Sequence, residues 1–170
     1  MLKSPVPDGH LNAIGRVTVN FAMLESSVAF LIWQLTGTEQ PTAQAITAEL
    51  SFRQLIALAS SLYRRYDVVG DDAARFETIL NRAVQAEERR NRITHSVWGA
   101  GKQRETVTRI KTTAKKSVGL KHQFEQMSVS DLEAEANFIA SVADEVQRFM
   151  FDQLTPIRAR RHNAHVDQGA

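Results

Sequence analysis

Apolar residues recur at intervals of three and four along most of this 170-residue chain, and this spacing constrains the fold more than any other feature. The pattern is clearest between residues 11 and 35, where it predicts a helix with one apolar stripe. Gly37 follows this segment, as expected for a residue that ends a helix. The stripe consists of Ile14, Val17, Phe21, Leu24, Val28 and Leu31.

Two shorter helices are expected next along the chain. The first runs from Pro41 or Thr42 to Leu50, because proline is well suited to the first turn of a helix. The second covers residues 51–66, where apolar residues again follow the helical spacing. This second stripe consists of Phe52, Leu55, Ile56, Leu58, Ala59, Leu62 and Tyr63.

A long helix is expected after the loop DVVGDD. Asp71 or Asp72 would cap this helix, which begins at Ala73, and Gly99 and Gly101 would end it. One position of its otherwise apolar stripe is an arginine. The stripe consists of Phe76, Ile79, Leu80, Ala83, Ala86, Arg90, Ile93 and Val97.

The helical spacing fades between residues 102 and 127, where Thr and Val become frequent in ETVTRIKTT, and we interpret this segment as a small β-hairpin. The stretch SDLE then predicts a capping box with Ser130 as N-cap, and the last helix would continue to Leu154. Pro156 ends it.

These segments together predict an all-α fold. We expect one up-and-down bundle of four main helices plus a short helix, with the hairpin inserted before the last helix. Only eight glycines and four prolines are present, which favours long regular elements. No repeat or linker divides residues 1–170, and residues 1–9 and 158–170 are expected to be flexible.

Composition excludes several classes of protein. The chain has no cysteine, so disulfides, thiolate catalysis and cysteine-bound zinc are ruled out. Its longest apolar run, VAFLIW, is far shorter than the roughly 20 residues that cross a bilayer. The first ten residues also lack the apolar stretch of a secretory signal. We therefore expect a cytoplasmic protein that does not enter a membrane.

Charge is unevenly distributed along the chain. Residues 101–122 hold seven Lys or Arg and one Glu, whereas residues 123–154 hold seven acidic residues and one Arg. The basic segment could pair with the acidic one or offer a surface to a polyanion. In the second case Lys111, Lys115 and Lys116, with Arg104, Arg109 and Lys121 of the same segment, would follow a nucleic-acid backbone.

The stretch EERRNRITHSVWG, residues 87–99, contains the clearest chemical motif. Arg90 and His95 are separated by four residues, and Asn91 directly follows the arginine. This pattern resembles the signature of the HEPN superfamily, helical-bundle proteins that include many metal-independent ribonucleases. The resemblance implies a single HEPN-like domain, a homodimer, RNA as substrate and no cofactor or metal. It also implies a setting in toxin or phage-defence systems, where an antitoxin protein is a possible partner.

The resemblance assigns roles that chemistry supports. His95 would act as general base on the 2′-hydroxyl, since histidine transfers protons near neutral pH. Arg90 would stabilise the phosphate through two donors, and Arg92 would help to bind the substrate. Asn91 would orient the histidine or the substrate. The products would carry a 2′,3′-cyclic phosphate.

Helical geometry leaves two arrangements open for this motif. On an unbroken helix Arg90 and His95 would point about 140° apart, whereas Asn91 and His95 would share a face. The helix could therefore end or distort before His95. Alternatively, two protomers could each supply part of the site, as the resemblance implies.

Arg90 also lies on the apolar stripe of its helix, so its charge requires a partner or an interface. Glu25 lies beside the stripe of the first helix, and we predict that it pairs with Arg90 or Arg89. The alternative for Glu25 is a boundary carboxylate with its head in water. The alternative for the whole stretch is an exposed helix end in a non-catalytic HEPN-like module that binds a nucleotide, a nucleic acid or a protein.

Overall fold

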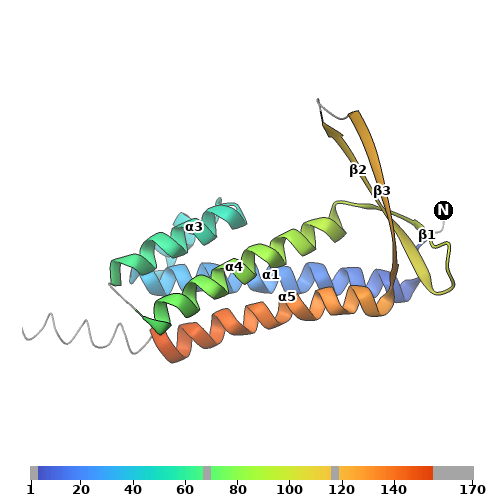
Figure 1. Ribbon diagram of the computed structural model, residues 1–170. Coiled ribbons are helices and arrows are strands. Elements are labelled where there is room, and N and C mark those ends of the chain that lie inside the picture. Colours follow the sequence, from blue (N-terminus) through green and yellow to red (C-terminus); the bar gives the residue numbers. More distant parts are fainter. Residues whose placement is uncertain (1–3, 67–69, 116–118, 155–170) are drawn as a thin grey trace, which may run out of the picture. The chain divides into compact units, whose positions relative to one another are not determined.

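The computed structural model describes residues 4–66, 70–115 and 119–154, and this part of the chain is mostly helical with one small antiparallel sheet (Figure 1). It contains all five predicted helices, so the helical class is confirmed. A single 3₁₀ turn follows α3, and a π-helical turn follows α5. The elements are α1 (Asp8–Thr36), α2 (Gln40–Thr47), α3 (Phe52–Tyr63), α4 (Asp71–Thr94), β1 (Val97–Ala100), β2 (Thr106–Lys115), β3 (Gly119–Ser128) and α5 (Val129–Phe149).

The chain divides into two compact units, and α1, α4 and α5 contribute residues to both. The first unit consists of residues 1–22 and 86–140, and the second of residues 23–85 and 141–170. The first unit therefore contains the whole sheet, the start of α1, the end of α4 and most of α5. The second contains α2 and α3.

The sheet of the first unit has the strand order β1–β2–β3, and both neighbouring pairs are antiparallel. Strands β2 and β3 form the hairpin that the sequence predicts before the last helix. Strand β1 pairs with the base of β2, with Val97 opposite Ile110 and Ala100 opposite Val107. The hairpin prediction is confirmed, and β1 is a third strand that the sequence did not indicate.

The end of α4 explains why this strand exists. The indole Nε1 of Trp98 donates to the carbonyl of Ile93 at 3.1 Å, and the hydroxyl of Ser96 donates to the carbonyl of Arg92 at 2.7 Å. These are carbonyls of the last helical turn, which lack partners within the helix. Side chains that follow the helix thus satisfy its last turn, and α4 stops at Thr94.

The prediction that this helix continues to Gly99 is therefore wrong. Val97, which fits the apolar stripe by spacing, is a strand residue with 69% of its surface exposed. The helical spacing extended past the true end because Val97 happens to lie four residues after the buried Ile93.

The start of α5 also differs from its prediction, because Ser128 and not Ser130 is the N-cap. The amide of Ser128 donates to Oδ2 of Asp131 at 2.8 Å, and the amide of Asp131 donates to Oγ of Ser128 at 3.2 Å, which is a reciprocal capping arrangement. In the sequence SVSDLE a serine is followed three residues later by an acidic residue twice, as Ser128 with Asp131 and as Ser130 with Glu133. Glu133 pairs instead with Arg16 of α1 at 3.3 Å.

This cap depends on pH. Hydrogen bonds from the hydroxyl and then the amide of Ser128 hold the pKa of Asp131 below its ordinary value. Since the folded pKa is depressed, the carboxylate stabilises the fold above its unfolded pKa. That contribution is lost as the pH falls through the lower folded value.

The core of the first unit lies between the start of α1, the end of α4, the start of α5 and the base of the sheet. The side-chain amide of Asn20 on α1 donates to the carbonyl of Ala136 on α5 at 2.8 Å, which links these two helices. Buried apolar residues of this core are Ala13, Val17, Phe21, Ala86, Ile93, Val107, Met127, Leu132, Ala136 and Ile139.

The second unit is centred on three aromatic rings. Tyr63 of α3 stacks on Phe76 of α4 with ring centroids 3.9 Å apart, and Phe149 of α5 lies 5.1 Å from Phe76. Buried residues around these rings include Leu24, Val28, Leu31, Ile32, Leu35, Phe52, Leu55, Ala59, Leu80, Ala83, Val142 and Val146.

The end of α1 in this unit agrees with its prediction. Gly37 has a φ of +66°, a conformation that a side chain disfavours, and its amide donates to the carbonyl of Trp33 at 3.2 Å. The glycine therefore ends α1 as the sequence indicated.

The phenol of Tyr63 makes stability sensitive to alkaline pH. Burial, and to a smaller extent the charge of Asp72, raise the pKa of Tyr63 to about 12. An unfolded tyrosine ionises near pH 10, so the neutral phenol stabilises the folded state below that pH, and stability is lost as the pH rises from about 10 to about 12. The Tyr63→Phe variant is expected to lose less stability in this range than the wild type, measured by urea unfolding at about pH 8 and about pH 11.

The other tyrosine is a matched control. The buried hydroxyl of Tyr63 has no hydrogen-bond partner among the described residues, whereas the Tyr66 hydroxyl donates to the carbonyl of Leu35 at 2.8 Å. At neutral pH, Tyr63→Phe is expected to leave the free energy of unfolding unchanged or raise it by up to about 1 kcal/mol, and Tyr66→Phe to lower it by about 1 kcal/mol. Equal effects of the two substitutions would contradict the contrast.

By length and composition, α1 could cross a membrane, although its unbroken apolar runs are short. An 18-residue window of this 29-residue helix has a mean hydropathy of 1.2, with 39% of the window buried. The core helix of a soluble protein passes the same test, so this is weak evidence for a membrane span.

Candidate functional site

The motif predicted to carry chemistry lies at the C-terminal end of α4, in the first unit. Arg90 and Asn91 belong to the helix, whereas His95 begins the turn toward β1. The amide of His95 donates to the carbonyl of Asn91 at 3.1 Å, and His95 is exposed. This amide bond is the last helical one, and α4 ends at Thr94, before His95, which is one of the two arrangements that the sequence left open.

Arg90 is half-buried, and its guanidinium lies over an aromatic ring. The guanidinium carbon is 4.1 Å from the centroid of Phe21 on α1, and the Nε atom is buried without a hydrogen-bond partner among the described residues. A cation over the face of a ring is attracted by the quadrupole of that ring. The ring of Phe21 is therefore a partner for the positive charge of Arg90, which the sequence places on the apolar stripe of its helix.

Arg89 and Arg92 share one carboxylate. Nη1 of Arg89 lies 3.0 Å from Oε2 of Glu135, and Nη2 of Arg92 binds the other oxygen of the same carboxylate. The side chain of Glu135 is only 12% exposed, while those of the two arginines are about 40% exposed. The guanidinium of Arg89 also lies over the ring of Phe138, 3.8 Å from its centroid. Glu135 thus orients two arginines whose outer edges still reach solvent.

The arrangement at the end of α4 can bind an anion and exchange a proton. The Arg89 and Arg92 guanidiniums share the carboxylate of Glu135, and both arginine side chains stay partly exposed, so each can still meet an anion. A planar guanidinium matches a phosphate with two parallel donors. An exposed imidazole one turn away supplies a group that transfers protons near neutral pH. No hydrogen bond joins Arg90 to His95 within the described part of the chain, so their cooperation stays a prediction.

Arg109 of β2 has a different position from the one that its basic segment suggested. Its side chain is 6% exposed and pairs with Glu125 of β3, with 2.8 Å from Nε to Oε2. Nη1 also donates to the carbonyl of Arg92 at 3.2 Å and to the hydroxyl of Ser96 at 3.1 Å. Arg109 therefore links the sheet to the end of α4. The prediction that Arg109 belongs to a cationic surface that follows a nucleic-acid backbone is wrong, because its side chain is buried.

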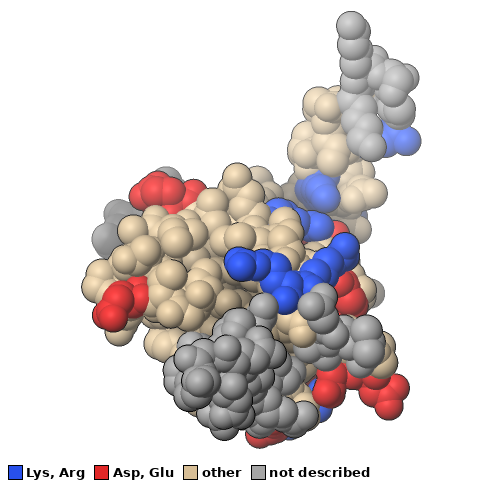
Figure 2. All heavy atoms as spheres, turned by 90° about the vertical axis from the view of Figure 1, so that its left-hand side faces the viewer, with Lys and Arg blue, Asp and Glu red and all other residues tan. Residues whose placement is uncertain are grey.

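The other cations of the basic segment are only partly described. Lys111 and Lys121 are exposed on the hairpin, where Figure 2 shows separate blue groups on the arm at the upper right. The side chain of Lys115 and the whole of Lys116 lie outside the described residues. Binding of RNA by Lys111, Lys115 and Lys116 remains a prediction.

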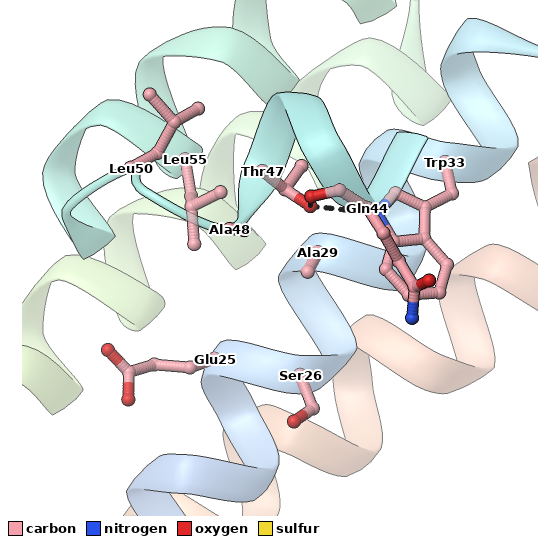
Figure 3. A pocket seen from close by; sticks show the side chains of 9 residues that line it. All are labelled: Glu25, Ser26, Ala29, Trp33, Gln44, Thr47, Ala48, Leu50 and Leu55. Atoms are coloured by element: carbon pink, nitrogen blue, oxygen red, sulfur yellow. Dashed lines mark hydrogen bonds between the residues drawn. The ribbon is translucent and has the colours of Figure 1, made fainter. Parts of the chain in front are cut away.

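Glu25 belongs to the second unit and lines a pocket of about 520 Å³ there. Figure 3 shows Glu25, Ser26, Ala29 and Trp33 along α1 on one side of this pocket. On the opposite side, the hydroxyl of Thr47 in α2 accepts a hydrogen bond of 2.9 Å from the Trp33 indole. Arg89 and Arg90 belong to the first unit, so the predicted ion pair of Glu25 with Arg90 or Arg89 stays a prediction.

Sequence reasoning missed Glu135, the carboxylate that organises this end of α4. The signal was present, because Glu135 lies three residues after Leu132 and four before Ile139, both of which are buried. An acid at helical spacing within an apolar stripe requires a partner in the same way as Arg90 does. The apolar stripes of α4 and α5 taken together indicate Glu135, in addition to Glu25, as a candidate partner for an arginine.

We expect Glu135→Gln to lower the free energy of unfolding by about 2 kcal/mol. The substitution removes the carboxylate that both partly buried guanidiniums bind, although their solvent exposure reduces the loss below that of a fully buried pair. Urea unfolding at neutral pH measures the change. Glu133→Gln is the matched control on the same helix, since Glu133 pairs with an exposed arginine and should change stability by less than about 0.5 kcal/mol. Equal losses in both variants would contradict a special role for Glu135.

Comparison of the chain with models of protein families, with curated proteins and with solved structures found no match.

Proposed function

We propose that this protein is a HEPN-like, metal-independent endoribonuclease whose active site is built at the C-terminal end of α4. His95 is the general base and Arg90 stabilises the scissile phosphate. Asn91 orients His95 or the substrate, and Arg92 contacts the RNA backbone. Arg89 is a supporting residue of this site. Glu25 pairs with Arg90 or Arg89 and holds that arginine in place.

In the proposed reaction, His95 removes the proton of a 2′-hydroxyl, and that oxygen attacks the adjacent phosphorus. The bond from phosphorus to the 5′-oxygen of the next nucleotide breaks, and that oxygen takes a proton. The products are a 2′,3′-cyclic phosphate and a 5′-hydroxyl. Negative charge grows on the phosphate oxygens during attack, which is where a guanidinium is most effective.

The observation that carries this proposal is the end of α4 at Thr94. On a continuous helix the Arg90 and His95 side chains would be held on different faces, but His95 follows the last helical residue and is exposed. We expect this exposed imidazole to turn toward a phosphate that the arginines of the last turns bind. Within the described part of the chain His95 is exposed, so burial does not fix its imidazole elsewhere.

The remaining parts of the proposal follow from the resemblance to HEPN proteins. The helices would form a four-helix up-and-down bundle with α2 as the short additional helix. The active form would be a homodimer in the cytoplasm, in a toxin or phage-defence setting. An antitoxin protein would then be the partner that restrains cleavage.

The direct test is incubation of the purified wild-type protein with mixed RNA in the presence of EDTA. We expect cleavage that EDTA does not reduce and products whose 3′ ends resist alkaline phosphatase until acid opens the cyclic phosphate. Intact RNA, or cleavage that stops when EDTA is added, would reject the proposal.

A second candidate function is a non-catalytic helical module that binds a nucleotide, nucleic acid or protein. The contacts of Arg89, Arg90 and Arg92 with Phe138, Phe21 and Glu135 favour it, because side chains held in this way also serve as structural anchors. Binding of RNA without cleavage in the same assay would support this candidate.

A further inference from the structure

The two faces of the sheet differ sharply in charge. Side chains of directly paired residues lie on the same face of an antiparallel sheet. The register therefore places the described Lys, Arg and Glu side chains of β2 and β3 on one face, where Arg109 pairs with Glu125, and Lys111 and Lys121 follow toward the tip. The base of this charged face packs into the core of the first unit through Val107.

The opposite face, which we call the neutral face, has no Lys, Arg, Asp or Glu in any of the three strands. At its centre Val97, Ile110 and Phe124 form a row across the sheet, and Leu120 lies nearer the tip. The neutral face comprises Val97, Gly99, Thr106, Thr108, Ile110, Thr112, Ala114, Leu120, His122, Phe124, Gln126 and Ser128.

Large apolar side chains on this face are open to solvent. Val97 is 69% exposed, Leu120 64% and Phe124 63%. Contiguous exposed apolar groups on a sheet favour association, and an edge strand such as β3 also presents unpaired backbone groups. A neutral apolar face of this kind indicates a protein partner, because a nucleic acid requires cations on the surface that it meets.

Absence of charge also indicates which protein partner fits. Two copies related by a two-fold axis bring the same residues opposite each other, so any net charge on such a face would oppose itself. The neutral face has no such charge, and charged residues are depleted at the centres of protein interfaces. Lys111 and Lys121 lie on the other face, away from the contact.

We propose that a second copy of this chain docks on the neutral face, with Phe124 and Val97 at the centre of a two-fold interface. The inference rests on the homodimer of the proposed function and names the surface that forms it. The lysines of the charged face stay free on both protomers of this dimer.

Sedimentation velocity of the full-length protein without RNA tests this interface. We expect a dimer for the wild type and monomers for Val97→Glu and Phe124→Glu, because each variant places two carboxylates opposite each other in an apolar contact. Lys111→Glu is the matched control, since it changes an exposed residue of the charged face and should remain a dimer. A monomeric wild type, or a dimer that survives both apolar substitutions, would overturn the proposal.

Cross-linking gives an independent test, because the chain has no cysteine of its own. In a two-fold dimer a residue near the axis meets its own copy, so Phe124→Cys should form a disulfide-linked dimer on mild oxidation. Lys111→Cys should stay mostly monomeric on a denaturing gel. Equal cross-linking of both variants would contradict docking through the neutral face.

These experiments separate the interface from the enzyme. A monomer that cleaves RNA with EDTA present would reject the interface and keep the ribonuclease. A dimer that Phe124→Glu disrupts, but that does not cleave RNA, would keep the interface and reject the ribonuclease.

Discussion

The His95→Ala protein is expected to cleave RNA at least about 100-fold more slowly than the wild type, because a positioned general base contributes on the order of 10²–10⁴-fold to such a reaction. His95 is exposed, and the hydrogen bond that its backbone amide donates to the carbonyl of Asn91 does not involve the side chain. The fold should therefore be retained. Initial rates on a labelled RNA in EDTA, together with thermal melting of both proteins, measure the two effects separately.

His122→Ala is the matched control for this loss. His122 is also an exposed histidine of the first unit, but it lies on the hairpin, where Nδ1 is 3.0 Å from the hydroxyl of Thr112. At a protein concentration where sedimentation shows that both variants are dimers, its removal should leave the rate within about twofold, since His122 takes no part in the proposed reaction. If His95→Ala and His122→Ala cleave equally well, His95 is not the base.

The second large effect concerns stability. Arg109→Met is expected to lower the free energy of unfolding by about 3 kcal/mol, because it removes a buried guanidinium that binds Glu125, the Arg92 carbonyl and the Ser96 hydroxyl. Methionine keeps much of the side-chain volume, so the loss reflects the missing hydrogen bonds more than a cavity. Urea unfolding of the purified variant at neutral pH measures it.

Lys111→Met controls for this substitution two residues along the same strand. Lys111 lies on the same face of β2 but is exposed, so its replacement should change stability by less than about 0.5 kcal/mol. A loss of similar size in both variants would show that methionine in the strand, and not the buried guanidinium, is responsible.

The helices were predictable because their signals are local. The stripe from Ile14 to Leu31 requires only the helical period, and Gly37 ends α1 because its φ of +66° suits glycine. The hairpin was predictable for a similar reason, since frequent Thr and Val indicate strands.

Helix ends were less predictable, because competing local signals are decided by distant contacts. The spacing of Ile93 and Val97 allows a longer helix, but the bonds from Trp98 and Arg109 to the last carbonyls of α4 come from the sheet. In the same way SVSDLE contains two possible capping boxes. Glu133, the acid of one of them, instead pairs with Arg16, 117 positions earlier in the chain.

The sequence by itself determined where helices form, which positions of each helix face a core and which residues carry the Arg90–His95 motif, because these properties depend on neighbours within a few positions. Only the tertiary structure decided that Glu135 holds Arg89 and Arg92, that Phe21 lies under Arg90, and that the described charged side chains of the strands share one face of the sheet. The physical reason is that a charged or aromatic side chain on the apolar stripe of a helix needs a contact partner. Which residue becomes that partner depends on how segments far apart in the chain pack together.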